Sequence, residues 1–505
     1  MLTCPSYIGV TFKLKATDEQ YDAIDAFDDE QNLSLIAGAG TGKTTVLKMM
    51  AEGDTRDGLY LAFNKSVQTE AEYKFRKTRV KARTAHSLAF KDFGAPRADR
   101  LPQGGTGFIR NSSLAKFLDI VPTTIKSQEL SERKISAAEL AHLSKQTVKR
   151  FTKTKDEYIS DEMVELPPLL AADAEVSAYL IPLIKKYAEK MWDNIVSLDS
   201  DMPISHDDYL KLYQLSRPFI DVDYIFLDEA QDADSLMVEI IKAQMDHAQV
   251  IAVGDRCQAI YGWRGGTIDA MKEFGGVEKH LTQSFRFGNA IASQANKILD
   301  LLDADIRLRG TPNIKSHVLF GERLELPDAV LTRTNIGGMV EILARQQAGQ
   351  RVSVAGKQKA ADMKKIAKAA QDLQEKGSTS HPDFSVFENW NEVIEFSETD
   401  EGQELAPLVN LVKTWNPSQI IDAIDSCVPD ETSDVVVSTA HIAKGLEWNT
   451  VRIGEDFFAP RYIDGVQQPL AREEAMLAYV AVTRAKHILD DYGLSWIYKY
   501  RGELA

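Results

Sequence analysis

Short apolar runs of four or five residues recur along the chain, and longer stretches with helix-like spacing of apolar positions separate them. Runs of this length are typical of buried strands, and their alternation with helices favours parallel sheets covered by helices on both faces. The runs fall into two blocks, so we predict an α/β fold with two cores. The first block comprises 33–36, 59–63, 80–83, 224–227 and 250–253, and the second comprises 329–332, 352–355, 435–438 and 450–453.

A mainly polar, helix-rich segment interrupts each block. The first segment ends in an amphipathic run from Ala178 to Val196. The second contains a basic helical stretch and then an acidic stretch from Glu392 to Glu404. We interpret both as inserted, mainly helical subdomains. The predicted domains are a first core from 1–94 and 201–280, its insertion at 95–200, a second core from 281–356 and 426–505, and a small insertion at 357–425.

A glycine-rich loop follows the first apolar run. Its sequence, AGAGTGKT from Ala37 to Thr44, has the spacing of a phosphate-binding loop, although the general pattern has glycine where Ala37 stands. Glycines let backbone N–H groups curve around phosphate oxygens, and the following helix adds a favourable dipole. Lys43 is expected at the β- and γ-phosphates and the Thr44 hydroxyl at Mg²⁺. The alternative is a glycine-rich turn that binds nothing. The predicted nucleotide contacts here are Gly38, Ala39, Gly40, Thr41, Gly42, Lys43, Thr44 and Thr45.

Two adjacent carboxylates end the apolar run at 224–227. Buried strands rarely finish in this way unless the carboxylates bind something. Asp228 is expected to hold Mg²⁺ through water, and Glu229 to orient or deprotonate the attacking water. An exposed acidic turn is the alternative. Together with the loop, the pair predicts hydrolysis of a nucleoside triphosphate.

Composition and charge narrow the classes of protein. At 505 residues the chain is too long for a single core. Its three cysteines are too few and too far apart for a disulfide framework or a cysteine-based metal site, and they fit a reducing cytosol. No run approaches the length of a membrane span, and the first residues lack the form of a signal peptide, so we expect no membrane association. A net charge of −16 argues against binding nucleic acid through bulk charge but allows a local basic track.

Further short motifs follow one another along the chain. They are TDEQ at 17–20, LAFNK at 61–65, TAHS at 84–87, GDRCQAIYGWRG at 254–265, QSFR at 283–286, STAHIAKGLEW at 438–448 and YVAVTRAK at 479–486. Their residues and order resemble superfamily 1 helicases of the UvrD/Rep/PcrA type, and within that group the F-box DNA helicases, although no F-box is expected in this chain. The resemblance covers about residues 15–490. It implies that both cores are RecA-like P-loop NTPase folds and that the cofactors are ATP and Mg²⁺.

For the nucleotide, the resemblance implies roles for residues in both cores. Gln20 would read the adenine edge with one donor and one acceptor, and Phe285 would pack on the ring. Gln258 would sense the γ-phosphate, and Glu447 would contact the sugar. Two arginines would act as fingers, each worth about 10³–10⁵ in rate, and the alternative for either is a plain surface residue. The implied catalytic residues are Lys43, Asp228, Glu229, Gln258 and the fingers Arg286 and Arg484, with Thr44 and Asp228 at the metal.

For DNA, the resemblance implies a bound single strand. Phe63 would stack on a base, and Tyr261 and Trp263 would meet further bases, with a pair of core aromatics as the alternative for the latter two. The basic stretch 74–83 would suit a groove that follows the strand, and a solvated charged face is the alternative. The implied DNA contacts are Phe63, Asn64, Thr84, His86, Tyr261, Trp263, Arg264, Thr439 and His441.

The implied function is an ATP-dependent 3′→5′ DNA helicase that acts on single-stranded and tailed duplex DNA, and the polarity comes from the resemblance alone. Two other hypotheses stay open: a translocase that strips proteins from single strands with little unwinding, and a nucleotide-switched DNA-binding protein. Repair, recombination, replication and phage defence are all compatible with the sequence, which names no protein partner. We expect a cytoplasmic, nucleoid-associated protein of a bacterial or phage-infected cell.

Overall fold

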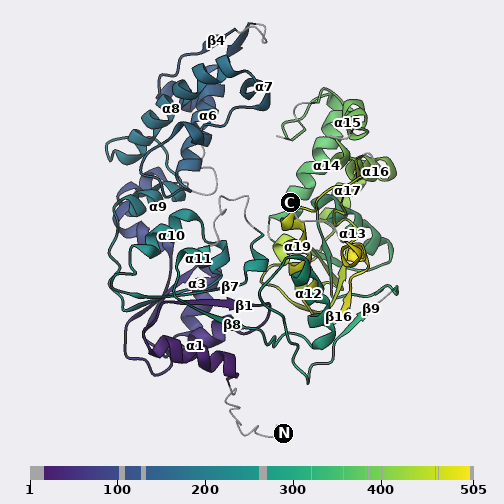
Figure 1. Cartoon of the computed structure of the whole chain (residues 1–505). Coiled ribbons are helices and arrows are strands. Elements are labelled where there is room, and N and C mark those ends of the chain that lie inside the picture. The colour runs from purple at the N-terminus through teal and green to yellow at the C-terminus, as the bar shows by residue number, and fades with distance from the viewer. Residues whose placement is uncertain are drawn as a thin grey trace, which may run out of the picture. The chain divides into compact units, whose positions relative to one another are not determined.

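The chain folds into two compact units, which are described separately (Figure 1). Unit 1 holds the described residues of 16–36, 43–256 and 270–280, and unit 2 holds those of 37–42, 257–260 and 281–500. The structure is a computed structural model that describes residues 16–101, 109–126, 132–260, 270–319, 321–356, 358–381, 383–384, 387–399, 402–460, 462–463 and 466–500.

A six-stranded sheet lies at the centre of unit 1. Its strands are ordered β3 (Val80–Thr84), β2 (Gly58–Ala62), β6 (Tyr224–Leu227), β7 (Gln249–Gly254), β1 (Leu33–Ala37) and β8 (Val277–Leu281). The pairs that join the first five strands are parallel. Every residue of β1, β2, β6 and β7 is buried, whereas the edge strand β3 alternates buried and exposed side chains. The apolar runs are unbroken because helices cover the central strands on both faces.

Helices of unit 1 begin at polar residues that cap them. The side chains of Thr17, Asn64, Thr84, Ser205 and Asp234 each accept a hydrogen bond from a backbone N–H in the first turn of a helix. Such caps satisfy donors that the helix itself cannot. The helices are α1 (Asp18–Asp28), α2 (Lys43–Ala51), α3 (Lys65–Lys74), α4 (Ala85–Ala89), α9 (His206–Leu215), α10 (Ser235–Lys242) and α11 (Ala270–Glu273).

The first insertion builds its own apolar core within unit 1. Its elements are α5 (Asn111–Phe117), the antiparallel hairpin β4 (Thr123–Ile125) and β5 (Arg133–Ile135), α6 (Ala137–Phe151), α7 (Pro168–Ala171) and α8 (Ala174–Val196). Helices α6 and α8 pack along each other, as Figure 1 shows, and bury Leu140, Phe151, Leu180 and Ile184 between them. The amphipathic run predicted at 178–196 lies within α8, and its regularly spaced apolar residues form the buried face of that helix.

Unit 2 has a second parallel sheet of six strands. The strands are ordered β11 (Val352–Val354), β12 (Val435–Thr439), β10 (Ala329–Thr332), β13 (Trp448–Ile453), β16 (Ala485–Asp490) and β9 (His317–Leu319), and every neighbouring pair is parallel. The flanking helices are α12 (Asn289–Leu301), α13 (Asn335–Gln347), α18 (Ala440–Ala443) and α19 (Arg472–Val482), and β14 (Tyr462–Ile463) and β15 (Val466–Gln467) form a small hairpin.

The second insertion is helical and shares a core with unit 2. It comprises α14 (Lys359–Lys376), α15 (Trp390–Ser397), α16 (Ala406–Thr414) and α17 (Pro417–Asp425). Apolar residues of these helices, among them Leu373, Trp390 and Leu408, pack in one cluster with Ile342 of α13. The insertion is therefore joined to the sheet through α13.

The predicted fold class, α/β with two parallel sheets, is confirmed. Each predicted apolar run falls on a strand. Strands β8 and β16 were not predicted because their sequences mix apolar with charged residues, and β9 and the strands of the two hairpins were not predicted because they are only two or three residues long. Among the helices that the structure describes, none is both long and apolar enough to cross a membrane.

Candidate nucleotide and nucleic-acid sites

The predicted phosphate loop joins the end of β1 to the start of α2. Gly40 and Gly42 adopt left-handed backbone angles, with φ of 73° and 79°, which glycine adopts without strain. A Cβ atom on Gly40 would lie 2.6 Å from Cβ of Arg286, so no larger residue fits. The Thr41 hydroxyl donates to the Gly38 carbonyl at 2.9 Å and fixes the turn from inside.

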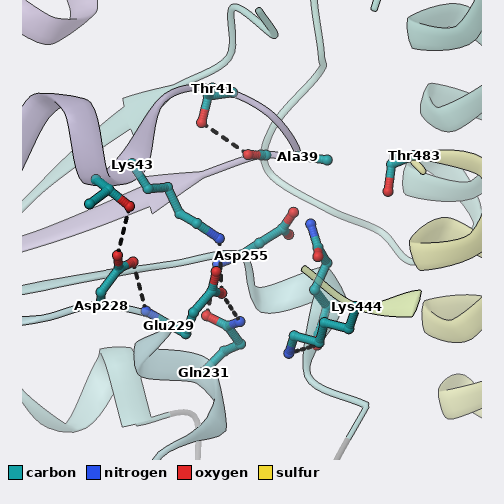
Figure 2. Close-up of polar contacts among 12 residues, drawn as sticks. Ala39, Thr41, Lys43, Asp228, Glu229, Gln231, Asp255, Lys444 and Thr483 are labelled. Carbon is teal, nitrogen blue, oxygen red and sulfur yellow. Dashed lines mark hydrogen bonds and ion pairs between the residues drawn. The ribbon is translucent and has the colours of Figure 1, made fainter. Parts of the chain in front are cut away.

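Lys43, the first residue of α2, lies among carboxylates. Its Nζ donates to Glu229 Oε2 at 2.9 Å (Figure 2), and its side chain is 13% exposed. Burial alone would lower the pKa of this ammonium group, but the carboxylates of Glu229, Asp228 and Asp255 outweigh burial and raise it. Lys43 is therefore a stable cation at the position predicted for phosphate.

Asp228 follows the last residue of β6 and is held on both oxygens. Its Oδ2 accepts from the Thr44 hydroxyl at 3.0 Å and from the Tyr60 hydroxyl at 2.7 Å, and its Oδ1 accepts from the Glu229 backbone N–H at 2.9 Å. Burial, and then the neighbouring Glu229 carboxylate, raise the pKa of Asp228. A hydroxyl and a carboxylate in direct contact are hard oxygen ligands, so this pair fits Mg²⁺.

Glu229 carries the second carboxylate in a left-handed backbone conformation, with φ 52° and ψ 41°. Besides Lys43, its Oε2 accepts from Gln231 Nε2 at 2.7 Å, and Gln231 Oε1 accepts from the Asp255 backbone N–H at 3.0 Å (Figure 2). Gln231 thus connects the turn after β6 to the turn after β7. Gln231 lies two residues after the predicted carboxylate pair, but neither it nor Tyr60 was predicted as a site residue.

In unit 2 the predicted finger Arg286 pairs with Glu447. Arg286 Nε donates to Glu447 Oε2 at 2.7 Å, and its Nη1 donates to the Thr483 carbonyl at 2.9 Å. Lys486 Nζ lies 2.5 Å from Glu447 Oε1. Burial would raise the pKa of Glu447, but the two cations outweigh it and lower the value. The predicted sugar contact is therefore an anion held by two cations, and Lys486 is a site residue that sequence reasoning missed.

The second predicted finger, Arg484, is deeply buried and contacts Gln258. Its Nη2 donates to Gln258 Oε1 at 3.2 Å and to the Thr483 hydroxyl at 3.0 Å, while Nε donates to the Val480 carbonyl at 2.9 Å. Lys444 Nζ donates to the Gln258 carbonyl at 2.6 Å. The structure thus brings two predicted catalytic residues, Gln258 and Arg484, together within unit 2.

The residues predicted to contact the base have different surroundings. Gln20 is buried, and its Oε1 accepts from the Thr17 backbone N–H at 3.1 Å in the capping box of α1. Phe285 and Thr45 are exposed. Gln20 would therefore have to contact adenine with a side chain that also caps α1. Its role at adenine stays a prediction.

Predicted DNA contacts cluster where strands of unit 1 end. Phe63 directly follows β2 and is 48% exposed. Asn64 and Thr84 cap α3 and α4 with their side-chain oxygens. His86 Nε2 lies 3.5 Å from Asp207 Oδ1. Tyr261, Trp263 and Arg264 lie outside the described residues.

Two further residues predicted to contact DNA, Thr439 and His441, are less exposed than Phe63. In unit 2, Thr439 is buried and its hydroxyl has no hydrogen-bond partner among the described residues, whereas His441 is partly exposed.

In the basic stretch of unit 1, Lys74 pairs with Glu70 at 2.6 Å and Arg79 with Asp57 at 2.7 Å. Arg83 lies 3.9 Å from Glu72. These ion pairs favour a solvated charged face over a free basic groove at 74–83.

Comparison with known proteins places this arrangement in a family. Residues 16–277, more than half of the chain, match the UvrD/REP helicase N-terminal domain. The chain belongs to the UvrD/REP helicase family. The two parallel sheets with flanking helices correspond to the paired RecA-like domains of such a helicase.

Relatives of this UvrD/REP helicase family member include two proteins that match nearly all of it. F-box DNA helicase protein 1 of Schizosaccharomyces pombe is 31% identical over 91% of the chain and 55% of its own length. F-box DNA helicase 1 of Gallus gallus is 28% identical over 94% of the chain and 49% of its own length. A probable DNA helicase of Mycoplasma pneumoniae is 24% identical over 53% of the chain. The chain spans about half the length of the F-box relatives it matches.

The expected location, the cytoplasm of a bacterial or phage-infected cell, is wrong. The relatives that cover at least nine-tenths of this UvrD/REP helicase come from a yeast and a bird, and the Mycoplasma relative covers about half of it. The expectation rested on few cysteines and on the lack of a long apolar run. Those features report redox conditions and membrane insertion, and neither distinguishes one kind of cell from another.

Proposed function

We propose that this chain is an ATP-dependent DNA helicase that moves 3′→5′ along single-stranded DNA and unwinds duplex, in DNA repair, recombination or replication. The observation that carries the proposal is the cluster at the ends of β1 and β6, where Lys43 contacts Glu229 and Thr44 contacts Asp228. Membership of the UvrD/REP helicase family and the F-box DNA helicase relatives support DNA as the substrate.

In this proposal the described residues divide the chemistry of hydrolysis. Thr44 and Asp228 would hold Mg²⁺, which neutralises charge on the phosphate oxygens when bound. Lys43 would leave Glu229 for the more highly charged phosphates, and this exchange would free the Glu229 carboxylate to accept a proton from water. Gln231 would then hold Glu229 in place, because it contacts the same oxygen as Lys43.

Arg286 would contribute a second exchange. Its guanidinium contacts Glu447, and a γ-phosphate that carries developing charge is a stronger partner than one carboxylate. Lys486 would keep Glu447 paired after Arg286 moves, because it contacts the other carboxylate oxygen. The proposed finger is therefore released without leaving an unpaired carboxylate.

Strand displacement tests the proposal. Duplexes with either a 3′ or a 5′ single-stranded tail are incubated with the protein, ATP and Mg²⁺, and with Lys43→Ala as the inactive control. Unwinding from the 3′ tail alone, lost in Lys43→Ala, is the expected result. Unwinding from the 5′ tail would overturn the polarity. DNA-stimulated ATPase activity without unwinding would instead favour a translocase that displaces proteins, and no ATPase activity would overturn the proposal.

A further inference from the structure

The buried hydroxyl of Tyr60 contacts the carboxylate of Asp228, the residue proposed to hold Mg²⁺. Tyr60 lies in the middle of β2, is 1% exposed, and donates from its hydroxyl to Asp228 Oδ2 at 2.7 Å. It belongs to none of the sequence motifs described above. The contact joins two neighbouring strands of unit 1.

The sheet and the core fix where this hydroxyl can be. Parallel register puts Tyr60 opposite Phe226, two residues before Asp228. The Tyr60 ring packs on Phe75 with centroids 5.3 Å apart, and Phe75 in turn packs on Phe226 at 6.1 Å. The Tyr60 ring is therefore buried within an aromatic cluster, and its hydroxyl has little freedom to leave Asp228.

A carboxylate needs such a contact to keep one orientation. The last torsion of an aspartate is broad, so the plane of the carboxylate is set by its hydrogen bonds. Asp228 Oδ1 is held by the Glu229 backbone N–H, and Oδ2 is held by Thr44 and Tyr60. Because Thr44 would itself turn toward a bound cation, Tyr60 is the partner of Oδ2 that stays in place.

The geometry points to Tyr60 as a positioning residue that orients the Asp228 carboxylate for Mg²⁺, an inference that rests on the proposed ATPase function. Phenylalanine would fill the same space, as its use at positions 75 and 226 of this core indicates. The Tyr60 hydroxyl is buried and paired, and its partner is Asp228, so replacing Tyr60 with phenylalanine removes one defined contact. Outer contacts of this kind typically change metal affinity by about 10–100-fold.

Tyr224 supplies a matched control on the adjacent strand. It is also a fully buried tyrosine of the same sheet, yet its hydroxyl has no hydrogen-bond partner among the described residues. Tyr60→Phe and Tyr224→Phe therefore remove the same atom from the same layer. Only the first removes a contact to Asp228.

The test measures dependence on Mg²⁺ in the full chain by two readouts. One is the Mg²⁺ concentration for half-maximal ATPase activity, and the other is the affinity for a fluorescent ATP analogue at a series of Mg²⁺ concentrations and in EDTA. We expect Tyr60→Phe to need about tenfold more Mg²⁺ in both, with kcat at saturating Mg²⁺ and affinity in EDTA close to wild type. Tyr224→Phe should match wild type throughout.

A double variant separates positioning from packing. In the Asp228→Asn background, adding Tyr60→Phe should not change the Mg²⁺ dependence of nucleotide binding further. An unchanged Mg²⁺ dependence in Tyr60→Phe overturns the inference, as does an equal loss in EDTA and in Mg²⁺, which would indicate damage to the core. If the wild type binds nucleotide but does not hydrolyse it, the proposed function fails, and the binding readout still decides the role of Tyr60.

Discussion

At the scale of single residues, the two predicted arginine fingers differ in the hydrogen bonds that they make within their own unit. Arg484 is 1% exposed, and its guanidinium donates hydrogen bonds within its own unit to Gln258, Thr483, Val480 and Leu446. The Arg286 side chain donates to Glu447 and to the Thr483 carbonyl. Substitution should therefore separate a catalytic arginine from one that is also structural.

We expect Arg286→Ala to lower the ATPase rate by about 10³-fold or more with the melting temperature nearly unchanged. Arg484→Ala should abolish activity and also lower the melting temperature by several degrees, because it leaves buried acceptors without donors. Steady-state ATPase assays and thermal melts measure both effects, and exposed Arg351→Ala is the control. Equal melting temperatures for the two variants would contradict the distinction.

A buried carboxylate at the start of α9 makes stability depend on pH. Burial, and then the adjacent Asp207 carboxylate, raise the pKa of Asp208 to about 6, although its hydrogen bonds with Ser205 oppose the shift. A carboxyl whose pKa is raised by folding stabilises the fold fully below its unfolded pKa of 3.8, and this stabilisation is lost as the pH rises through about 6.

Asp208→Asn removes this titration while keeping an oxygen that can accept from the Ser205 N–H. Relative to wild type, the variant should therefore gain stability between pH 4 and pH 8, by up to about 3 kcal/mol, at about 1.4 kcal/mol per pKa unit. Urea unfolding of both proteins at the two pH values measures the gain. The same difference in free energy of unfolding at both pH values would refute the burial argument.

Residues that are neighbours in sequence could be predicted, and residues that meet through the fold could not. Lys43, Thr44, Asp228 and Glu229 lie in short motifs whose spacing alone signals phosphate and metal chemistry, and the structure places their side chains in contact. Tyr60 reaches Asp228 only because β2 and β6 are adjacent in the sheet. Nothing in the apolar run around Tyr60 indicates which strand will lie beside it.

At the scale of elements, the side chains proposed to act on nucleotide and DNA follow the ends of parallel strands. Central strands could be predicted because burial on both faces demands unbroken apolar sequence, as in β1, β2 and β6. The edge strands β8 and β9 carry charged or histidine side chains, so their sequences resemble loops. The caps of α3 and α4 show another limit, because Asn64 and Thr84 were predicted only as DNA contacts and also begin helices.

Phe63, just beyond β2, tests whether this edge of the sheet meets DNA bases. Phe63→Ala should weaken binding of single-stranded DNA by about 5- to 150-fold, because stacking on one base is worth roughly 1–3 kcal/mol. Tyr73→Ala on α3 is the control, because Tyr73 is also an exposed aromatic residue. The Arg76 guanidinium lies over its ring, 4.0 Å from the ring centroid. Fluorescence anisotropy measures both, and equal losses would refute a specific role for Phe63.

At the scale of the whole molecule, charge limits how DNA can be bound. The chain carries a net charge of −16, and Lys74 and Arg79 of the basic stretch are paired with carboxylates. Lys74 and Arg79 would therefore have to leave carboxylate partners before they could contact phosphates. Binding that relies on stacking and on a few hydrogen bonds depends less on salt than binding through a basic surface.

We therefore expect a weak salt dependence. A plot of log affinity for single-stranded DNA against log salt concentration should have a slope of about −3 or shallower, equivalent to roughly four phosphates at about −0.7 each. Anisotropy titrations between 50 and roughly 300 mM NaCl measure the slope. A clearly steeper slope would indicate a basic track that the ion pairs at 74–83 argue against.

Glu229 occupies a backbone conformation that costs a glutamate about 1 kcal/mol and costs glycine almost nothing. The side chain that the proposed reaction needs is thus not the one that best suits the turn. Glycine at this position would relieve that cost but would also remove the carboxylate that pairs with Lys43. Under the proposed function, the turn keeps a backbone conformation that is unfavourable for glutamate because hydrolysis needs a carboxylate at this position.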